Sequence, residues 1–257
     1  MRGLRLRLWQ GGVLLGFLLL WEWASRTGRL DPFFFSKPSE ILARVLRWFA
    51  SGEIYPHLYV TTLEMLLAFG FGTLLGVLLG VWLALAPGVA AVLDPYIKAL
   101  NAIPRVVLAP IFTLWFGLGI LSKVALGITL VFFVAFFNTY QGVKEVSPVV
   151  LHNAKLLGAR GFHLLRYVYL PSAASWIFSS LRTSIGFAVI GAVVGEYLGS
   201  AAGLGYLIAQ AEGVFDTTGV FAGMVVLMVF VLILDALVGL LERRLLVWQP
   251  KAQGGGQ

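Results

Sequence analysis

The feature that most limits how this chain can fold is a series of long apolar stretches with few charged residues. Each is about twenty residues long, the length at which a helix crosses roughly 30 Å of hydrocarbon. Hydrophobic residues make up 59% of the chain and charged residues 12%, whereas soluble domains have about half and about a quarter. Barrel strands need short segments of alternating polarity, and the sequence shows none. The sequence therefore predicts an all-α membrane protein.

The apolar stretches predict about six membrane-spanning helices in three regions. The first region, 1–57, holds one span and an external connector with a short interfacial helix over 40–49, capped by Ser39. A core of five spans follows over 58–248, and 249–257 form a polar, disordered tail. The predicted spans are 8–24, 58–85, 92–116, 123–140, 172–194 and 220–241.

Glycine and proline give two of these spans a particular character. The second span carries small residues four positions apart, a spacing that lets a neighbouring helix approach closely. Pro104 and Pro110 interrupt the third span, because proline cannot continue a helix's hydrogen bonding. The glycines of the second span are Gly70, Gly72, Gly76 and Gly80.

Loop charge predicts the orientation of the chain. An even number of spans places both termini on one side, and the loops on that side hold twelve lysines and arginines against six on the other. Because basic loops stay inside the cell, we expect both termini in the cytoplasm. The twelve are Arg2, Arg5, Arg7, Lys98, Arg105, Lys144, Lys155, Arg160, Arg166, Arg243, Arg244 and Lys251; the six are Arg26, Arg29, Lys37, Arg44, Arg47 and Lys123.

The chain lacks the residue patterns of an enzyme. It has no cysteine, which excludes disulfides and thiol catalysis. Its three histidines, His57, His152 and His163, have no metal-ligand spacing, and no phosphate-binding loop ending in Lys-Ser or Lys-Thr is present. We therefore expect no catalytic residue, no metal site and no nucleotide bound by this chain.

A few polar residues in or near the spans are candidates for a solute path. Charged residues are costly inside a bilayer, so Glu64, Arg182 and Asp235 are candidates for a functional role. Glu64 and Asp235 lie near predicted span ends, where their side chains can instead reach water. An ion pair between two helices explains Arg182 equally well, and interhelical hydrogen bonds explain polar amides equally well. The path candidates are Asn101, Asn138, Arg182 and Glu196.

The longest polar interruption runs from Lys144 to Pro171. Its apolar residues recur at helical spacing, and Gly158 breaks the run near its middle, which predicts an amphipathic element between two spans. Such an element usually contacts a partner. The charge count places it in the cytoplasm.

The spacing around Gly158 resembles the Glu-Ala-Ala loop signature of permease subunits in bacterial ABC importers. That signature has Glu-Ala-Ala, three residues, Gly, nine residues and Ile-x-Leu-Pro, and here the corresponding residues are His152-Asn153-Ala154, Gly158 and Val168-Tyr169-Leu170-Pro171. His152 and Asn153 depart from the signature, which affects any salt bridge of the family's glutamate but not a helix–glycine–helix shape.

Further segments are similar to the nitrate, sulfonate and taurine branch of that family. They include 94–119, the Asn138-Thr139 pair with Gly142, 170–208 and 234–248, so the resemblance covers nearly all of 61–248. It implies a type I importer permease fold and transport of a small, anionic solute such as nitrate, taurine or an alkanesulfonate. One branch of relatives carries pyrimidine precursors of thiamine instead.

The resemblance also implies the location, a bacterial inner membrane, and the partners. Two permease copies, expected as a homodimer, would form the path, cytoplasmic ATPases would bind ATP and Mg²⁺, and an extracytoplasmic binding protein would deliver the solute. A coupling helix would insert into a groove on each ATPase, with Gly158 allowing the turn after it. The coupling residues are His152, Asn153, Ala154, Lys155, Leu157, Gly158, Ala159 and Arg160.

Two other classes compete with this interpretation. A secondary transporter driven by an ion gradient would have a longer chain with detectable inverted halves. An intramembrane enzyme would need a polar catalytic cluster, and only scattered charges are present.

Overall fold

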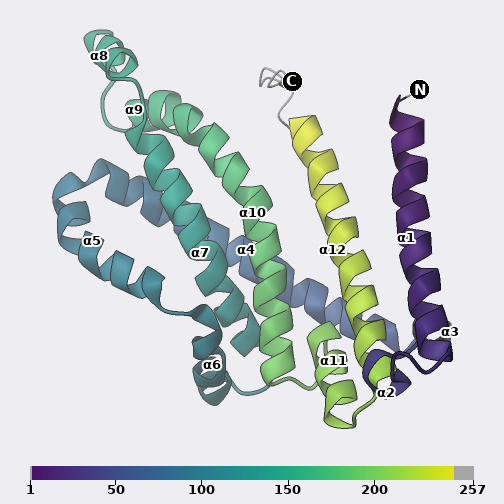
Figure 1. The fold of residues 1–257 in the computed structure, drawn as a ribbon. Coiled ribbons are helices and arrows are strands. Elements are labelled where there is room, and N and C mark those ends of the chain that lie inside the picture. The colour runs from purple at the N-terminus through teal and green to yellow at the C-terminus, as the bar shows by residue number, and fades with distance from the viewer. Residues whose placement is uncertain (1, 246–257) are drawn as a thin grey trace. The chain divides into compact units, whose positions relative to one another are not determined.

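The computed structural model describes the backbone of residues 2–245 and the side chains of residues 6 and 8–240. Every regular element in this part of the chain is helical (Figure 1). The predicted tail, 249–257, lies outside the described residues. The elements are α1 (Arg2–Arg26), α2 (Pro32–Phe35), α3 (Pro38–Ser51), α4 (Ile54–Leu85), α5 (Pro87–Ala102), the 3₁₀ helix η1 (Arg105–Leu108), α6 (Ala109–Phe116), α7 (Ile120–Lys144), α8 (Pro148–Leu156), α9 (Phe162–Leu164), the π-helix η2 (Leu165–Tyr169), α10 (Leu170–Leu198), α11 (Leu204–Gly213) and α12 (Thr217–Leu245).

Four helical stretches in the described chain are long and apolar enough to cross a membrane: 54–85, 120–144, 162–198 and 217–240. A fifth span results if α5 and η1–α6 form one span that is broken near Pro104. The predicted first span corresponds to α1, which is 25 residues long.

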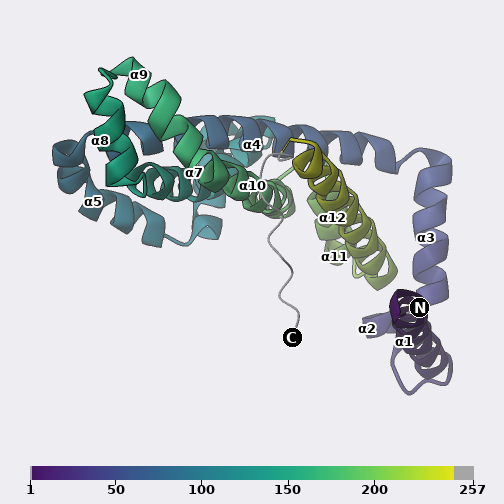
Figure 2. The ribbon, with the colours of Figure 1, turned by 90° about the horizontal axis from the view of Figure 1, so that it is seen from above.

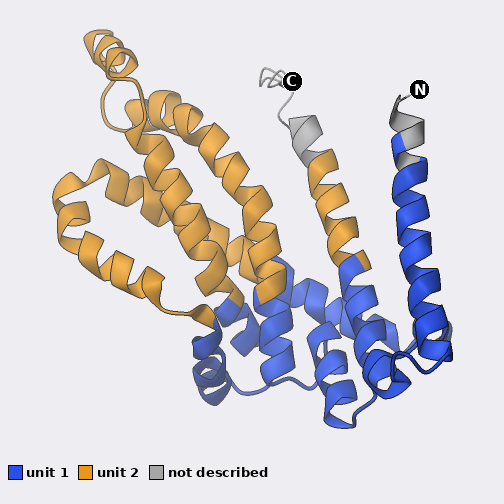
Figure 3. Cartoon of the chain, in the orientation of Figure 1, with its two compact units in different colours: residues 1–66, 106–126, 191–228 blue, residues 67–105, 127–190, 229–257 orange. Residues whose placement is uncertain are grey.

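The chain forms two compact units, coloured separately in Figure 3. Unit 1 contains 1–66, 106–126 and 191–228, and unit 2 contains 67–105, 127–190 and 229–257. The long helices α4, α7, α10 and α12 each contribute residues to both units. Each unit is therefore assembled from segments far apart in the sequence.

In unit 2, α4 and α7 pack closely through the glycines that the sequence singled out. A Cβ atom added at Gly72 would lie 2.7 Å from the Val131 side chain, and one at Gly76 would lie 2.7 Å from the Ala135 Cβ atom. Gly80 meets the α7 backbone in the same way, whereas Gly70 has open space around it. The predicted close approach is confirmed for three of the four glycines.

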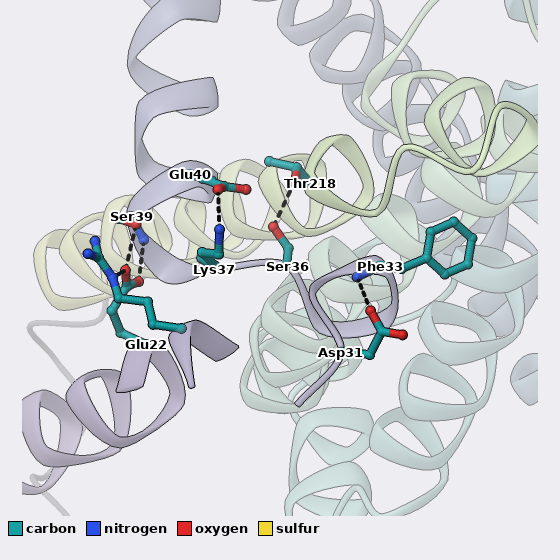
Figure 4. A network of polar contacts seen from close by, with 9 residues as sticks. Glu22, Asp31, Phe33, Ser36, Lys37, Ser39, Glu40 and Thr218 are labelled. Atoms are coloured by element: carbon teal, nitrogen blue, oxygen red, sulfur yellow. Dashed lines mark hydrogen bonds and ion pairs between the residues drawn. The ribbon is translucent and has the colours of Figure 1, made fainter. Parts of the chain in front are cut away.

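In unit 1, polar side chains attach the N-terminal connector to the turn before α12 (Figure 4). The Ser36 hydroxyl lies 2.7 Å from the Thr218 hydroxyl, and the Arg44 guanidinium donates to the Asp216 carboxylate at 2.6 Å. Asp31 caps α2 by accepting from the Phe33 amide. These contacts fix α2 and α3 at the start of α12.

The amphipathic helix predicted over 40–49 is present as α3, which Figure 2 shows leading toward the start of α4. The predicted cap is wrong, because Lys37 occupies the N-cap position and Ser39 lies inside the first turn. The Ser39 hydroxyl and amide instead donate to the Glu22 carboxylate at 2.8 and 3.0 Å (Figure 4). The Glu22 carboxylate, which is distant in the sequence, therefore accepts a hydrogen bond at the start of α3, where the sequence pattern predicted a cap by the Ser39 side chain.

Candidate functional site

The polar stretch predicted to contact a partner, 144–171, contains a helix with no buried residue. This helix, α8, projects beyond the ends of α7 and α10 within unit 2 (Figure 1). Leu156 is 74% exposed and Leu157 is 89% exposed, at the end of α8 and just after it. Leu156 and Leu157 therefore present apolar surface at the end of α8.

A hydrogen-bonded turn ends α8 at Gly158. The Ala159 amide donates to the Ala154 carbonyl and the Gly158 amide to the Lys155 carbonyl, each at 3.0 Å. Gly158 has a φ of +87°, so this is a Schellman motif with glycine at its left-handed position. A Cβ atom at Gly158 would meet nothing within 4 Å. The turn thus requires glycine for its backbone conformation and not for lack of space.

After this turn, the chain forms one continuous helix from Phe162 to Leu198. The π-helix η2 joins α9 to α10, with the Leu170 amide donating to the Leu165 carbonyl. Pro171 has no amide hydrogen, and the wider π turn carries the helix past this missing donor. The prediction that a new span begins at Pro171 is wrong, because the helix begins nine residues earlier, within the polar stretch.

The base of the loop is tightly packed. Val143 from the end of α7, Ala173 from the start of α10 and Ala84 from the end of α4 form one buried cluster. A Cβ atom at Gly142 would lie 2.8 Å from the Cβ atom of Trp176, so α7 and α10 are in close contact here. The exposed helix is therefore attached to a well-packed pair of helix ends.

The eight predicted coupling residues all lie on this loop. Ala154 and Ala159 are half-buried and meet in the Schellman turn, and the others are exposed. The exposed residues are His152, Asn153, Lys155, Leu157, Gly158 and Arg160. Because His152 and Asn153 point into solvent, their departure from the family signature leaves the helix–glycine–helix shape unchanged.

Two of the predicted path residues, Asn101 and Asn138, line one cavity in unit 2. Its volume is about 430 Å³, and its walls include the aromatic rings of Phe133, Phe137 and Phe187. Asn138 is half-buried, and its amide donates to the Val134 carbonyl at 2.8 Å. The cavity is of a size that holds a small solute.

The third polar residue of this cavity, Arg105, was assigned to a loop by the sequence pattern. Its guanidinium carbon lies 4.6 Å from the centre of the Phe133 ring, a cation–π contact near the middle of α7. Nη2 donates to the Asn101 side-chain oxygen at 2.8 Å. The signal that could have identified it is the break at Pro104, since broken spans often hold the polar site of a transporter.

Arg182, another predicted path residue, has an acidic partner in unit 2. Its Nη2 lies 3.5 Å from a carboxylate oxygen of Asp235, and the pair connects α10 to α12. Both side chains are more than half exposed. This contact is the ion pair that the sequence allowed as the alternative to a path role.

Glu196, the fourth predicted path residue, belongs to unit 1 and is only 1% exposed. It accepts hydrogen bonds from the Thr61 hydroxyl at 2.6 Å and from the Gly205 amide at 2.7 Å. Thr61 in turn accepts from the Leu204 amide at 2.9 Å. Together these contacts satisfy amides at the start of α11, which would otherwise lack partners.

Two further ionisable groups surround Glu196. Glu64 and Lys123 are each 1% exposed, and both interact with Glu196. The Lys123 ammonium also donates to the carbonyls of Leu118 and Gly119. The sequence pattern counted Lys123 as an external loop residue, but its side chain is buried inside unit 1. The cluster therefore holds the starts of α4, α7 and α11 together with the end of α10.

The chain is similar to a known protein family over most of its length. The model of the family described as "Binding-protein-dependent transport system inner membrane component" matches residues 34–247. The chain is 31% identical to the putative aliphatic sulfonates transport permease protein SsuC of Bacillus subtilis (strain 168), covering 96% of this chain and 90% of that protein. It is 33% identical to the riboflavin transport system permease protein RibX of Chloroflexus aurantiacus, covering 92% and 88%.

A solved structure supports the same fold. The MetNI methionine ABC transporter in inward-facing conformations matches with a TM-score of 0.63 at 17% identity, covering 74% of this chain and 92% of that chain. The similarity at this identity concerns the fold, while the family model and the relatives carry the assignment. The chain therefore belongs to the binding-protein-dependent transport system inner membrane components, the transmembrane permease subunits of ABC importers.

Proposed function

We propose that the loop from Lys144 to Pro171 is the contact through which an ATPase subunit drives this permease. The observation that carries the proposal is α8, an exposed helix closed by a Schellman turn at Gly158 and followed by an unbroken helix to Leu198. A push on α8 is transmitted to α10 because no flexible joint lies after Phe162. The apolar side chains of Leu156 and Leu157 would enter a groove on the ATPase.

In this proposal ATP and Mg²⁺ bind to the partner ATPase, and a binding protein delivers the solute from the other side of the membrane. A second copy of the chain completes the path as a homodimer, and the termini lie in the cytoplasm. Arg105 lies against α7 and Lys123 is buried, so neither belongs in the count of basic loop residues. Without them, the loops on the side of the termini hold eleven basic residues and the opposite loops hold five, which supports cytoplasmic termini. The sulfonate, taurine and pyrimidine permeases of the family make a small solute the expected cargo.

A substitution at Gly158 tests the coupling role. In Gly158→Leu we expect membrane insertion to persist while uptake falls about tenfold relative to ATP hydrolysis, because a side chain costs about 1–2 kcal/mol in the left-handed conformation. The measurement is solute uptake and ATPase activity of the assembled transporter in proteoliposomes. Gly28→Leu is the matched control, since Gly28 has a φ of +74° and equally open surroundings but lies in the connector after α1.

Uncoupling in Gly158→Leu alone supports the proposal. Unchanged uptake and unchanged ATP hydrolysis in Gly158→Leu would contradict it. Equal losses in both variants would assign the effect to general backbone strain and would also contradict a coupling role for α8.

A further inference from the structure

We infer that Arg105, Asn101 and Asn138 form the binding site for the anionic group of the transported solute. The inference rests on the proposed function, because it assigns a substrate class to a cavity of the permease. The chemical class is a small organic solute with a sulfonate, or a similar oxyanion with at least two oxygens on one face. Each step below concerns residues of unit 2.

The cavity places apolar side chains around one cation. Its wall includes three aromatic rings, those of Phe133, Phe137 and Phe187, with the aliphatic side chains of Ile103, Leu130 and Val134. Charge-assisted hydrogen bonds gain strength where the local dielectric constant is low. A sulfonate group bound beside Arg105 would therefore be held more firmly than the same pair in water.

The Arg105 guanidinium is held in one orientation. Nη1 donates to the carbonyls of Leu100 at 3.1 Å and Asn101 at 3.0 Å, and it also contacts the Ile103 carbonyl. The face of the guanidinium lies against the Phe133 ring. A fixed guanidinium loses little conformational entropy when it binds an anion.

One edge of the guanidinium remains available for a ligand. The hydrogen bonds of Arg105 within the described residues use Nη1 and one bond from Nη2. The Nε–H and one hydrogen of Nη2 are not used by these bonds. Each can donate to one oxygen of a sulfonate or carboxylate.

Capping α5 explains only part of this arrangement. The contacts of Nη1 satisfy carbonyls at the end of α5, where a basic side chain is favourable. That role does not require an aromatic-walled cavity or a half-buried amide at Asn138 on another helix. A charge near the middle of α7 is also costly in a membrane unless it serves a function.

The names of the relatives do not decide whether the solute is charged, whereas the residues of the cavity favour an anion. One is named for aliphatic sulfonates, which are anions, and another at similar identity is named for riboflavin, which is neutral. A neutral solute would leave the Arg105 charge without a counter-charge beside the aromatic rings of the cavity. The residues of this chain therefore favour the anionic class.

A matched pair of probes tests the inference directly. Methanesulfonate and dimethyl sulfone have similar shapes, but only the first is charged. We would measure their binding by saturation-transfer NMR to the assembled permease–ATPase complex in nanodiscs without ATP, in the unsubstituted protein and in four variants. The variants are Arg105→Gln, Arg105→Lys, Asn138→Asp and, as the control, Lys98→Gln, which removes an exposed α5 charge paired with Asp94.

We expect methanesulfonate to bind at least about tenfold more tightly than dimethyl sulfone. Arg105→Gln should abolish that preference, Arg105→Lys should keep part of it, and Lys98→Gln should keep all of it. Asn138→Asp leaves the α5 contacts of Arg105 in place but adds a negative charge to the cavity, so it should also abolish the preference.

Equal binding of the two probes, or a preference that survives Arg105→Gln or Asn138→Asp, would overturn the inference. The proposed function fails in a different way, through the absence of ATP-driven uptake by the complete transporter. ATP-driven uptake of a neutral solute would agree with the proposed function but would contradict the inference that Arg105 binds an anionic group.

Discussion

At the scale of single residues, Glu196 explains the glycine-rich segment that precedes α11. Its carboxyl group occupies the space beside Gly203, where any Cβ atom would overlap it. Gly203 also has a φ of +117°, which side chains rarely adopt. The sequence shows the glycines but does not show why glycine is needed there. The position of the Glu196 side chain depends on its hydrogen bond with Thr61, which is more than a hundred residues away in the sequence.

We expect Gly203→Ala to lower the stability of the protein by about 1–3 kcal/mol, since it combines an unfavourable backbone with an overlap on Glu196. Thermal unfolding of the purified permease in detergent measures the effect. Gly213→Ala is the control, because Gly213 ends α11 and a Cβ atom there meets nothing within 4 Å. A melting temperature equally affected in both variants would rule out the described role of Glu196.

At the scale of elements, the interpretation of α4 from its sequence was largely correct. The four-residue glycine spacing predicted a close neighbour, and α7 fills that place. The spacing could not identify the neighbour or exclude Gly70, because both depend on how α4 is rotated in the fold. Likewise, the sequence indicated a helix, a glycine turn and a span in 144–171 but not the π-helix that joins them.

Bulk at the α4–α7 contact should prevent correct packing. In Gly76→Leu the new side chain meets the Phe132 carbonyl and the Phe136 amide, backbone atoms that cannot move aside. We expect a loss of at least about 1–3 kcal/mol and a lower yield of monodisperse protein. Size-exclusion chromatography with thermal melts provides the readout, and Gly70→Leu, which faces open space, should behave like the unsubstituted chain. Normal folding of Gly76→Leu would show that the two helices do not pack as described.

At the scale of the whole molecule, composition predicted an all-helical membrane protein, and the resemblance of the loop and of further segments to a known family predicted a permease. The break at Pro104 was also predicted, as was the exposed helix before Gly158. Two buried charges, Glu64 and Lys123, were not placed correctly because burial depends on contacts between distant segments. The sequence named two polar residues that line the cavity, Asn101 and Asn138, but did not name Arg105 or show that the three lie together.

The central claim is that an ATPase partner, and no ion gradient, drives solute movement through this permease. Reconstitution in proteoliposomes tests it, with the permease alone or together with its ATPase and binding protein. We predict uptake only when all three components and ATP are present, and none from the permease alone under a proton or sodium gradient. Gradient-driven uptake by the permease alone would contradict the account.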